Sequence, residues 1–247
     1  MTSRKDIENG RLIYTEDLGW IDLGHAKGDD SKMLWDQLIT EGNGSPYKKG
    51  YFLVYYFQEM SKYNISTRVA AQWMVKKGLS IETKRSIAFS IMYCVSLEFE
   101  TLQSNSFFSH FSDSGFSCED LVSNLLGLYK SVLPRDYMSL IKPKDKEYAY
   151  KIWDYYGPVG KYKNRELKPW FFPDPDKYPN NAFPYKKSLP YYLNIIKPFY
   201  SYRKDIVISH YIPVIFQVAS LLAALTHPGH IVTYAPGDSL LCRRDAS

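Results

Sequence analysis

The chain has 247 residues, of which 45% are hydrophobic and 23% are charged, and its formal net charge is +5. This composition is typical of a globular protein, and it excludes a disordered, collagen-like or disulfide-scaffold chain. The length is sufficient for a full core and predicts one or two domains. The unusual feature is the aromatic content, with 22 Tyr, 13 Phe and 5 Trp.

The cysteines and the first residues indicate where the protein is made. Cys94, Cys118 and Cys242 are few, odd in number and widely spaced, which argues against a disulfide framework and a structural zinc site. The first eight residues lack the apolar segment of a secretory signal. We therefore expect synthesis in the cytoplasm without a signal peptide.

Hydrophobic periodicity and capping residues predict a mainly α-helical single domain over residues 1–247. Residues 1–29 are expected to be irregular, with a short extended piece at Leu12-Ile13-Tyr14, and residues 51–60 form a buried helix or a strand. Helices are predicted over residues 31–40, 67–75, 83–103, 117–134, 145–156 and 198–226. Eight prolines predict an irregular, aromatic-rich excursion over residues 157–198, and an apolar C-terminal helical region follows over residues 198–237.

The segment 206–237 contains no Asp, Glu, Lys or Arg, and its first 21 residues are enough to cross a bilayer. Pro213 would interrupt a helix there, which favours a buried helix or helix pair in a soluble core. Insertion into a membrane, as in a pore-forming toxin, is the alternative.

Glu98 is the first candidate catalytic residue. In a helix of 100° per residue it lies within the apolar stripe that contains Ile87 and Ile91, whereas Glu100 lies on the opposite side and is expected to be solvated. Burial disfavours the charged carboxylate and raises its pKa, which suits a general acid or base near neutral pH. A structural Glu paired with a buried cation or a backbone N–H is the competing interpretation.

Two histidine segments are further candidates. Asp22 and His25 lie three residues apart in a segment that contains Gly19 and Gly24, and a His beside a carboxylate can act as a general base or a metal ligand. His227 and His230 could join His25 in a zinc site, but the usual zinc motifs are absent. We expect no metal and no cofactor.

The loop after the helix at residues 83–103 and the next helix at residues 117–134 each supply one polar candidate for substrate binding. Asp113 follows Glu98 by 15 residues, an arrangement that two-carboxylate glycosidases can use. Asn124 borders the apolar face of the next helix and could point at the same place.

Two of these segments resemble a bacterial envelope-associated family of unassigned function over about residues 14–135. The motif G-[FW]-I-D-x-x-H is matched by Gly19-Trp20-Ile21-Asp22-Leu23-Gly24-His25. The motif F-S-x-E-D-L-x-S-N-L-L-G is matched by Phe116-Ser117-Cys118-Glu119-Asp120-Leu121-Val122-Ser123-Asn124-Leu125-Leu126-Gly127. A third element, W-H-E, is kept only as Ser96-Leu97-Glu98, which argues against a His ligand on that helix. The resemblance implies that His25, Glu98, Glu119 and Asn124 act together in the bacterial envelope.

An aromatic tract covers residues 148–202. It holds 17 aromatic residues and nine cations against four anions, so it carries the whole net charge of the chain. Tyr and Trp offer flat apolar faces with a polar edge, which suit sugar rings. Tyr155, Tyr156 and Trp170 are therefore candidates for substrate binding. Packing of a long loop with few aliphatic residues is the competing interpretation, and a nucleic-acid partner is disfavoured because no binding motif or dense basic run is present.

Together these features predict a hydrolase that targets the bacterial envelope, an antibacterial effector acting on peptidoglycan with Glu98 as general acid or base. His25, oriented by Asp22, would be the second catalytic group, with Glu119 and Asn124 shaping the site. Such a protein without a signal peptide would be exported by a specialised machine such as type VI secretion, would act in a target periplasm and would have an immunity protein as partner. A membrane-inserting toxin and a non-enzymatic binding or adaptor protein are the alternatives.

Overall fold

The computed structural model describes residues 2–42, 44, 48–62, 65–104, 115–180, 182–199, 205–211 and 214–218. The chain forms two compact units, each built from separate stretches of sequence. Unit 1 contains Met1–Asp29 and Glu100–Ile196, and unit 2 contains Asp30–Phe99 and Lys197–Ser247. This division does not test the expectation of a single domain, which stays a prediction.

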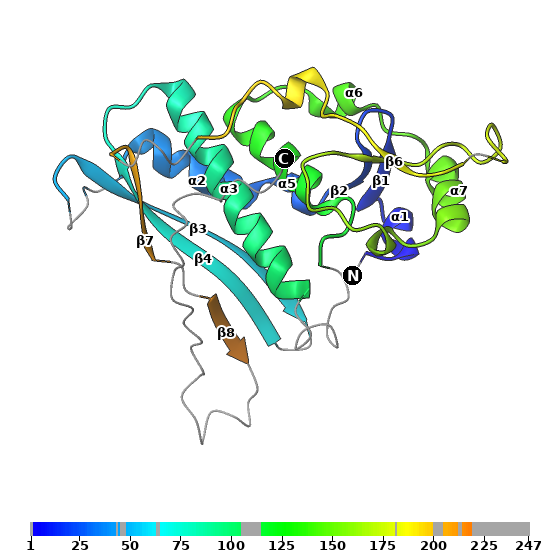
Figure 1. Cartoon of the computed structure of the whole chain (residues 1–247), viewed down its shortest axis with the longest axis horizontal. Coiled ribbons are helices and arrows are strands. Elements are labelled where there is room, and N and C mark those ends of the chain that lie inside the picture. The colour runs from blue at the N-terminus through cyan, green and yellow to red at the C-terminus, as the bar shows by residue number, and fades with distance from the viewer. Residues whose placement is uncertain are drawn as a thin grey trace. The chain divides into compact units, whose positions relative to one another are not determined.

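Unit 1 combines short helices with two small antiparallel hairpins (Figure 1). Its hairpins are β1 (Leu12–Thr15) with β2 (Gly19–Asp22), and β5 (Trp170–Phe171) with β6 (Tyr185–Lys186). Its α-helices are α1 (Arg4–Glu8), α5 (Asp120–Val132), α6 (Tyr137–Ile141) and α7 (Lys146–Tyr156). Single 3₁₀ turns occur at His25–Lys27 (η1), Val159–Lys161 (η2) and Tyr191–Leu193 (η3).

Aromatic side chains dominate one core cluster of unit 1. The buried rings of Tyr14, Trp20, Tyr156 and Phe172 pack with Ile152 and with aliphatic residues of α1, β1 and α7. The Tyr14 hydroxyl both donates to the carbonyl of Phe172 and accepts from its N–H, at 3.0 Å in each case. Much of the aromatic tract is therefore core, because a proline-rich segment with few aliphatic residues excludes water with its rings.

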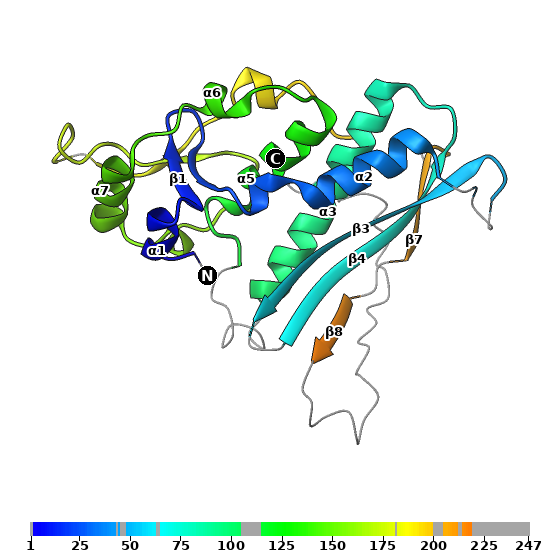
Figure 2. The same ribbon diagram turned by 180° about the vertical axis from the view of Figure 1, so that it is seen from behind.

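The strands of unit 2 form one antiparallel sheet around a central strand. β3 (Tyr51–Lys62) and β4 (Ile65–Lys76) make a long hairpin, while β7 (Val207–Tyr211) and β8 (Val214–Val218) both pair with the other edge of β4 (Figure 2). The helices α2 (Asp29–Thr40) and α3 (Ile81–Ser104) precede and follow the hairpin in the chain, and α3 belongs to unit 1 from Glu100 onward.

The outer edge of β3 is covered in part by a helix side chain. The amide nitrogen of Gln37, on α2, donates to the carbonyl of Tyr55 at 2.8 Å, and its Oε1 accepts from the N–H of Tyr55 at 2.8 Å. The side-chain amide therefore bonds this residue as a neighbouring strand would.

The prediction of a mainly α-helical fold is wrong, because six α-helices and three antiparallel sheets in the described residues make the protein mixed α/β. The helices expected at residues 31–40, 83–103, 117–134 and 145–156 are confirmed as α2, α3, α5 and α7, with shifted ends. The extended piece at residues 12–14 is confirmed as β1, and residues 51–60 lie in β3.

Two predicted helices are strands instead. Residues 67–75 lie in β4, where Val69, Ala70 and Ala71 are all buried, so the strand lacks the alternation that would have identified it. The start of the expected C-terminal helix forms β7 and β8, which are rich in the β-branched residues that favour strands. Residues 219–237 lie outside the described part of the chain. No helix among the described residues is long and apolar enough to span a membrane.

Candidate functional site

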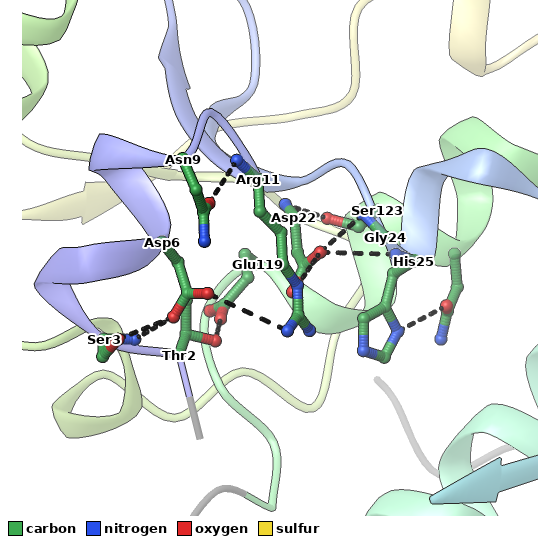
Figure 3. A network of polar contacts seen from close by, with 11 residues as sticks. Thr2, Ser3, Asp6, Asn9, Arg11, Asp22, Gly24, His25, Glu119 and Ser123 are labelled. Atoms are coloured by element: carbon green, nitrogen blue, oxygen red, sulfur yellow. Dashed lines mark hydrogen bonds and ion pairs between the residues drawn. The ribbon is translucent and has the colours of Figure 1, made fainter.

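A tight turn after β2 carries His25. The register of the β1–β2 hairpin pairs Leu12 with Asp22, so Arg11 lies next to Asp22 across the two strands. The buried Asp22 carboxylate accepts from Arg11 Nη2 at 2.9 Å and from the N–H of Gly24 at 2.7 Å. A longer bond of 3.4 Å runs to Asp22 from the N–H of His25 (Figure 3). Asp22 therefore fixes the backbone of the turn and not the imidazole ring.

Helix α5 holds the same turn from the other side. Ser123 Oγ accepts from the N–H of Asp22 at 3.0 Å, and Lys130 Nζ donates to the carbonyl of Ala26 at 2.9 Å. The backbones meet at two glycines, because a Cβ on Gly28 would lie 2.5 Å from the carbonyl oxygen of Gly127. Gly28 also has a φ of +76°, a conformation that favours glycine. Side chains at these two positions would push the turn away from α5.

This close approach brings the two sequence motifs together. Nδ1 of His25 lies 3.0 Å from Oδ1 of Asn124, the residue one helical turn before Gly127. An amide oxygen only accepts hydrogen bonds, so the contact places the proton of a neutral imidazole on Nδ1. The lone pair then lies on Nε2, the nitrogen that can accept a proton from water or substrate. His25 is partly exposed, whereas Asn124 is buried.

Three carboxyl groups are buried in the same unit, Glu100 at the end of α3 and Glu119 and Asp120 at the start of α5, and the first two interact electrostatically with His25. The pKa of Glu100 is raised to about 6, mainly by burial and also by the charge of Glu119, while the bond from the N–H of Phe116 and the charge of His25 act in the opposite direction. Burial also raises the pKa of Glu119 and of Asp120, which repel each other and Glu100. All three carboxyls therefore hold their protons to a higher pH than exposed carboxyls do.

The first residues of the chain cover one of these carboxyls. Thr2 Oγ1 donates to Glu119 Oε1 at 2.8 Å, and Figure 3 shows Thr2 and Glu119 side by side to the left of the Arg11 guanidinium. Arg4 holds this segment in place with two bonds to Asp154 on α7, at 2.8 and 3.0 Å. Glu119 Oε2 has no hydrogen-bond partner among the described residues.

Glu100 is bonded to a strained piece of backbone. Its Oε2 accepts from the N–H of Phe116 at 2.5 Å, and Phe116 has a φ of +59°, in the left-handed region. The carbonyl of Phe116 accepts from the N–H of Asn164 at 2.8 Å. These two bonds hold a conformation that costs about 1–3 kcal/mol in an ordinary loop.

The predicted burial of Glu98 and exposure of Glu100 is wrong, since Glu98 is exposed and Glu100 retains 1% of its surface. The buried face of α3 includes a polar stripe of Ser96, Glu100 and Gln103, spaced at i, i+4 and i+7. Because these side chains are polar, the sequence predicts that this face of the helix is exposed to solvent. The grounds for Glu98 as a catalytic group are thereby removed.

The remaining predicted residues fall in three groups. His25, Asp22, Glu119 and Asn124 lie together in unit 1, and Asp113, His227 and His230 lie outside the described residues. Tyr155 is exposed on α7, whereas Tyr156 is buried and donates to the carbonyl of Pro173 at 2.6 Å. Trp170 is half-buried against Tyr162, with ring centroids 5.7 Å apart.

Arg11 is the functional candidate that the sequence reasoning missed. Its guanidinium is about half exposed, and Nε would lie 3.3 Å from a Cβ on Gly24, the neighbour of His25. Figure 3 shows it between Asp22, Glu119 and Asp6, on the side of the turn where the His25 ring lies. The signal was the hairpin register, which places residue 11 next to residue 22 once β1 and β2 are paired.

Neither a metal centre nor a cysteine nucleophile emerges from the described part of the chain. No group of three or more His, Cys, Asp or Glu side chains within it has the arrangement of a metal site. Cys118 is buried, and burial raises the pKa of its thiol well above the usual value, which disfavours the reactive thiolate. The site therefore presents one partly exposed imidazole, one partly exposed guanidinium and buried carboxyls.

Comparison with known proteins gives no family: no family model, curated protein or solved structure matches the chain. The resemblance to an envelope-associated family stays a prediction that rests on the two motifs.

Proposed function

We propose that the protein is a hydrolase of the bacterial cell wall in which His25 is the general base. The observation that supports this most directly is the bond between His25 Nδ1 and Asn124 Oδ1, which leaves the lone pair on Nε2 of a partly exposed ring. A histidine with only a structural role would not need an exposed ring, whereas the ring of His25 is partly exposed.

The arrangement supports attack of water on a carbonyl group. Nε2 of His25 would accept a proton from water while the oxygen attacks the carbonyl carbon, and the same proton would then pass to the departing amine. The guanidinium of Arg11 beside Gly24 could stabilise the oxyanion that forms. Glu100, whose pKa of about 6 is lowered by the charge of His25, would be ionised above that pH and would stabilise the imidazolium.

Amide hydrolysis is favoured over cleavage of a glycosidic bond. Glycosidases of the common type place two carboxyl groups on either side of the bond that breaks. The carboxyls near His25 are buried, whereas Glu98 is exposed, so they do not form such a pair on either side of a substrate. The peptide cross-links and amide bonds of peptidoglycan are therefore the proposed target, and the choice of this polymer rests on the envelope resemblance and the aromatic tract.

The proposed setting follows from the proposed substrate. A cell-wall hydrolase made in the cytoplasm is harmless there and acts after export into a target periplasm, where an immunity protein would protect kin. Insertion of residues 206–237 into a membrane is the second candidate, but Val207–Tyr211 and Val214–Val218 pair with β4 as strands.

The test uses purified full-length protein and insoluble peptidoglycan. Wild type should release soluble fragments with new amino groups and no new reducing ends, and His25→Ala should lower the rate at least about a hundredfold. Glu98→Gln is the matched control, because this exposed side chain lies outside the proposed site, and its rate should equal that of wild type.

Arg11→Lys separates the oxyanion role from folding. Lysine keeps the charge beside Asp22 but not the planar guanidinium, so kcat should fall about tenfold or more while thermal stability changes little. Release of fragments by His25→Ala at the wild-type rate would reject the proposal. Depolarisation of cells without any fragments would favour the membrane-inserting alternative.

A further inference from the structure

A short stripe of exposed side chains runs along β6 and the residues on either side of it. Phe183, Tyr185 and Lys187 are exposed, whereas Pro184 and Lys186 between them are less so. Side chains alternate between the two faces of an extended chain, so these three lie on one face at intervals of about 7 Å. Phe183 is 75% exposed and Tyr185 is 47% exposed.

The stripe is supported from beneath. The buried ring of Phe171, on β5, stacks on Tyr185 with centroids 6.2 Å apart and an interplanar angle of 28°. Lys187 Nζ lies 3.8 Å from the centroid of the Phe171 ring, and the backbone N–H of Lys187 donates to the carbonyl of Pro169 at 3.0 Å. Tyr185 and Lys187 are therefore held in place before any ligand arrives, which lowers the entropy cost of binding.

The charge next to the stripe is positive. All four anions of residues 148–202 have a cationic partner: Asp154 pairs with Arg4, Glu166 with Lys168, and Asp174 and Asp176 with Lys151. Lys187 has no carboxylate within ion-pair distance among the residues that the structure describes. The stripe thus offers two aromatic faces and one cation that a ligand can neutralise.

We infer that Phe183, Tyr185 and Lys187 form a docking surface for an anionic glycan strand, separate from the residues around His25. The choice of cell-wall glycan as the occupant rests on the proposed function. Aromatic faces can pack against the apolar faces of sugar rings, and Lys187 can pair with a carboxylate on the strand. Single-stranded nucleic acid fits less well, because it needs several cations along its phosphates and Lys186 already lies 3.8 Å from Glu166.

This surface differs from the one expected from the sequence. Tyr156 is buried and Trp170 is half-buried, so neither offers a free face as Phe183 does, whereas Tyr155 is exposed and its role stays a prediction. The docking surface would hold the protein on an insoluble polymer, while the residues around His25 act on bonds within reach.

The experiment measures co-sedimentation of the full-length protein with peptidoglycan sacculi, in a His25→Ala background so that hydrolysis cannot release it. Phe183→Ala with Tyr185→Ala should weaken binding at least about tenfold, and Lys187→Gln should weaken it a few-fold. Tyr191→Ala is the matched control, because Tyr191 is 77% exposed and lies outside the stripe, and it should bind as the parent does. Thermal unfolding of each variant shows that the fold is kept.

The result expected is binding that survives in His25→Ala, is lost in the stripe variants and is weaker for a neutral glycan such as chitin. The inference is overturned if the parent does not sediment, if the double variant binds as tightly as the parent, or if Tyr191→Ala weakens binding equally. Tighter binding to a single-stranded oligonucleotide would also overturn it. Because binding is scored without catalysis, a failure of the hydrolase proposal gives a different result: equal fragment release by wild type and His25→Ala with unchanged sedimentation.

Discussion

The imidazole of His25 is anchored through Nδ1 to Oδ1 of Asn124 at 3.0 Å, although the two residues are 99 positions apart in the chain. One residue lies in a turn after a hairpin and the other within a buried helix. Their contact depends on the close approach of Gly28 to Gly127, where neither backbone leaves room for a Cβ. Two short motifs thus act as one structural element.

Asn124→Ala should lower the rate of fragment release about ten- to a hundredfold, mainly through kcat. The alanine cannot accept the Nδ1 proton, so the ring loses both its orientation and its tautomer preference. Asn124→Asp should retain much of the rate, because a carboxylate oxygen accepts the same bond. A loss in KM alone, or equal losses in both variants, would contradict a positioning role for this side chain.

Glu100→Gln should flatten the pH dependence of stability. The pKa of Glu100 is about 6 in the folded protein and lower in the unfolded chain, so the folded state binds more protons between these values. Ionised Glu100 therefore destabilises the fold above pH 6, and this cost disappears as the pH falls toward 4.5. The difference amounts to about 2 kcal/mol for a shift of this size.

The measurement is chemical denaturation of wild type and Glu100→Gln at a series of pH values from 4.5 to 8. The variant should be the more stable protein at pH 8, and the advantage should vanish near pH 4.5. Glutamine can still accept from the N–H of Phe116, so the strained turn is kept. A variant that is less stable than wild type throughout this range would show that Glu100 is ionised and paired in the folded state.

Gly127→Ala should destabilise unit 1 by about 1–3 kcal/mol and reduce the rate of fragment release. The new Cβ would lie 3.0 Å from both Gly28 Cα and the carbonyl of His25, so the turn that carries the ring must shift. Gly78→Ala is the comparison, because a Cβ there meets nothing within 4 Å and only its φ of +74° opposes the change. That variant should lose about 1 kcal/mol of stability and keep its activity; an active Gly127→Ala would show that the contact does not position His25.

Helices were the predictable part of this fold, and strands were not. Apolar periodicity and capping residues predict α2, α3, α5 and α7. One such cap is Asp145, whose side chain accepts from the N–H of Tyr148 at 2.8 Å. β4 is buried on both sides over much of its length, and such a strand has no period to detect. At the end of the strand lie two cations and a glycine, a pattern that is typical of the C-terminus of a helix: Lys76-Lys77-Gly78.

The candidate site was predictable where local sequence carried the signal. His25, Asp22, Glu119 and Asn124 were all selected from motifs, and the structure brings them together. Glu100 could not be found, because a buried polar stripe on a helix looks like a solvated one until its partners are known. Arg11 required the hairpin register, which is a property of two strands and not of either alone.

The Gln37 amide has a consequence for association between copies of the chain. An exposed sheet edge can recruit a strand from another molecule and begin aggregation. By occupying both backbone groups of Tyr55, Gln37 interrupts the row of unpaired donors and acceptors that such a strand would need. The Gln37 side chain, which comes from a helix that the sequence predicts, thus hinders the addition of a strand from another copy along β3.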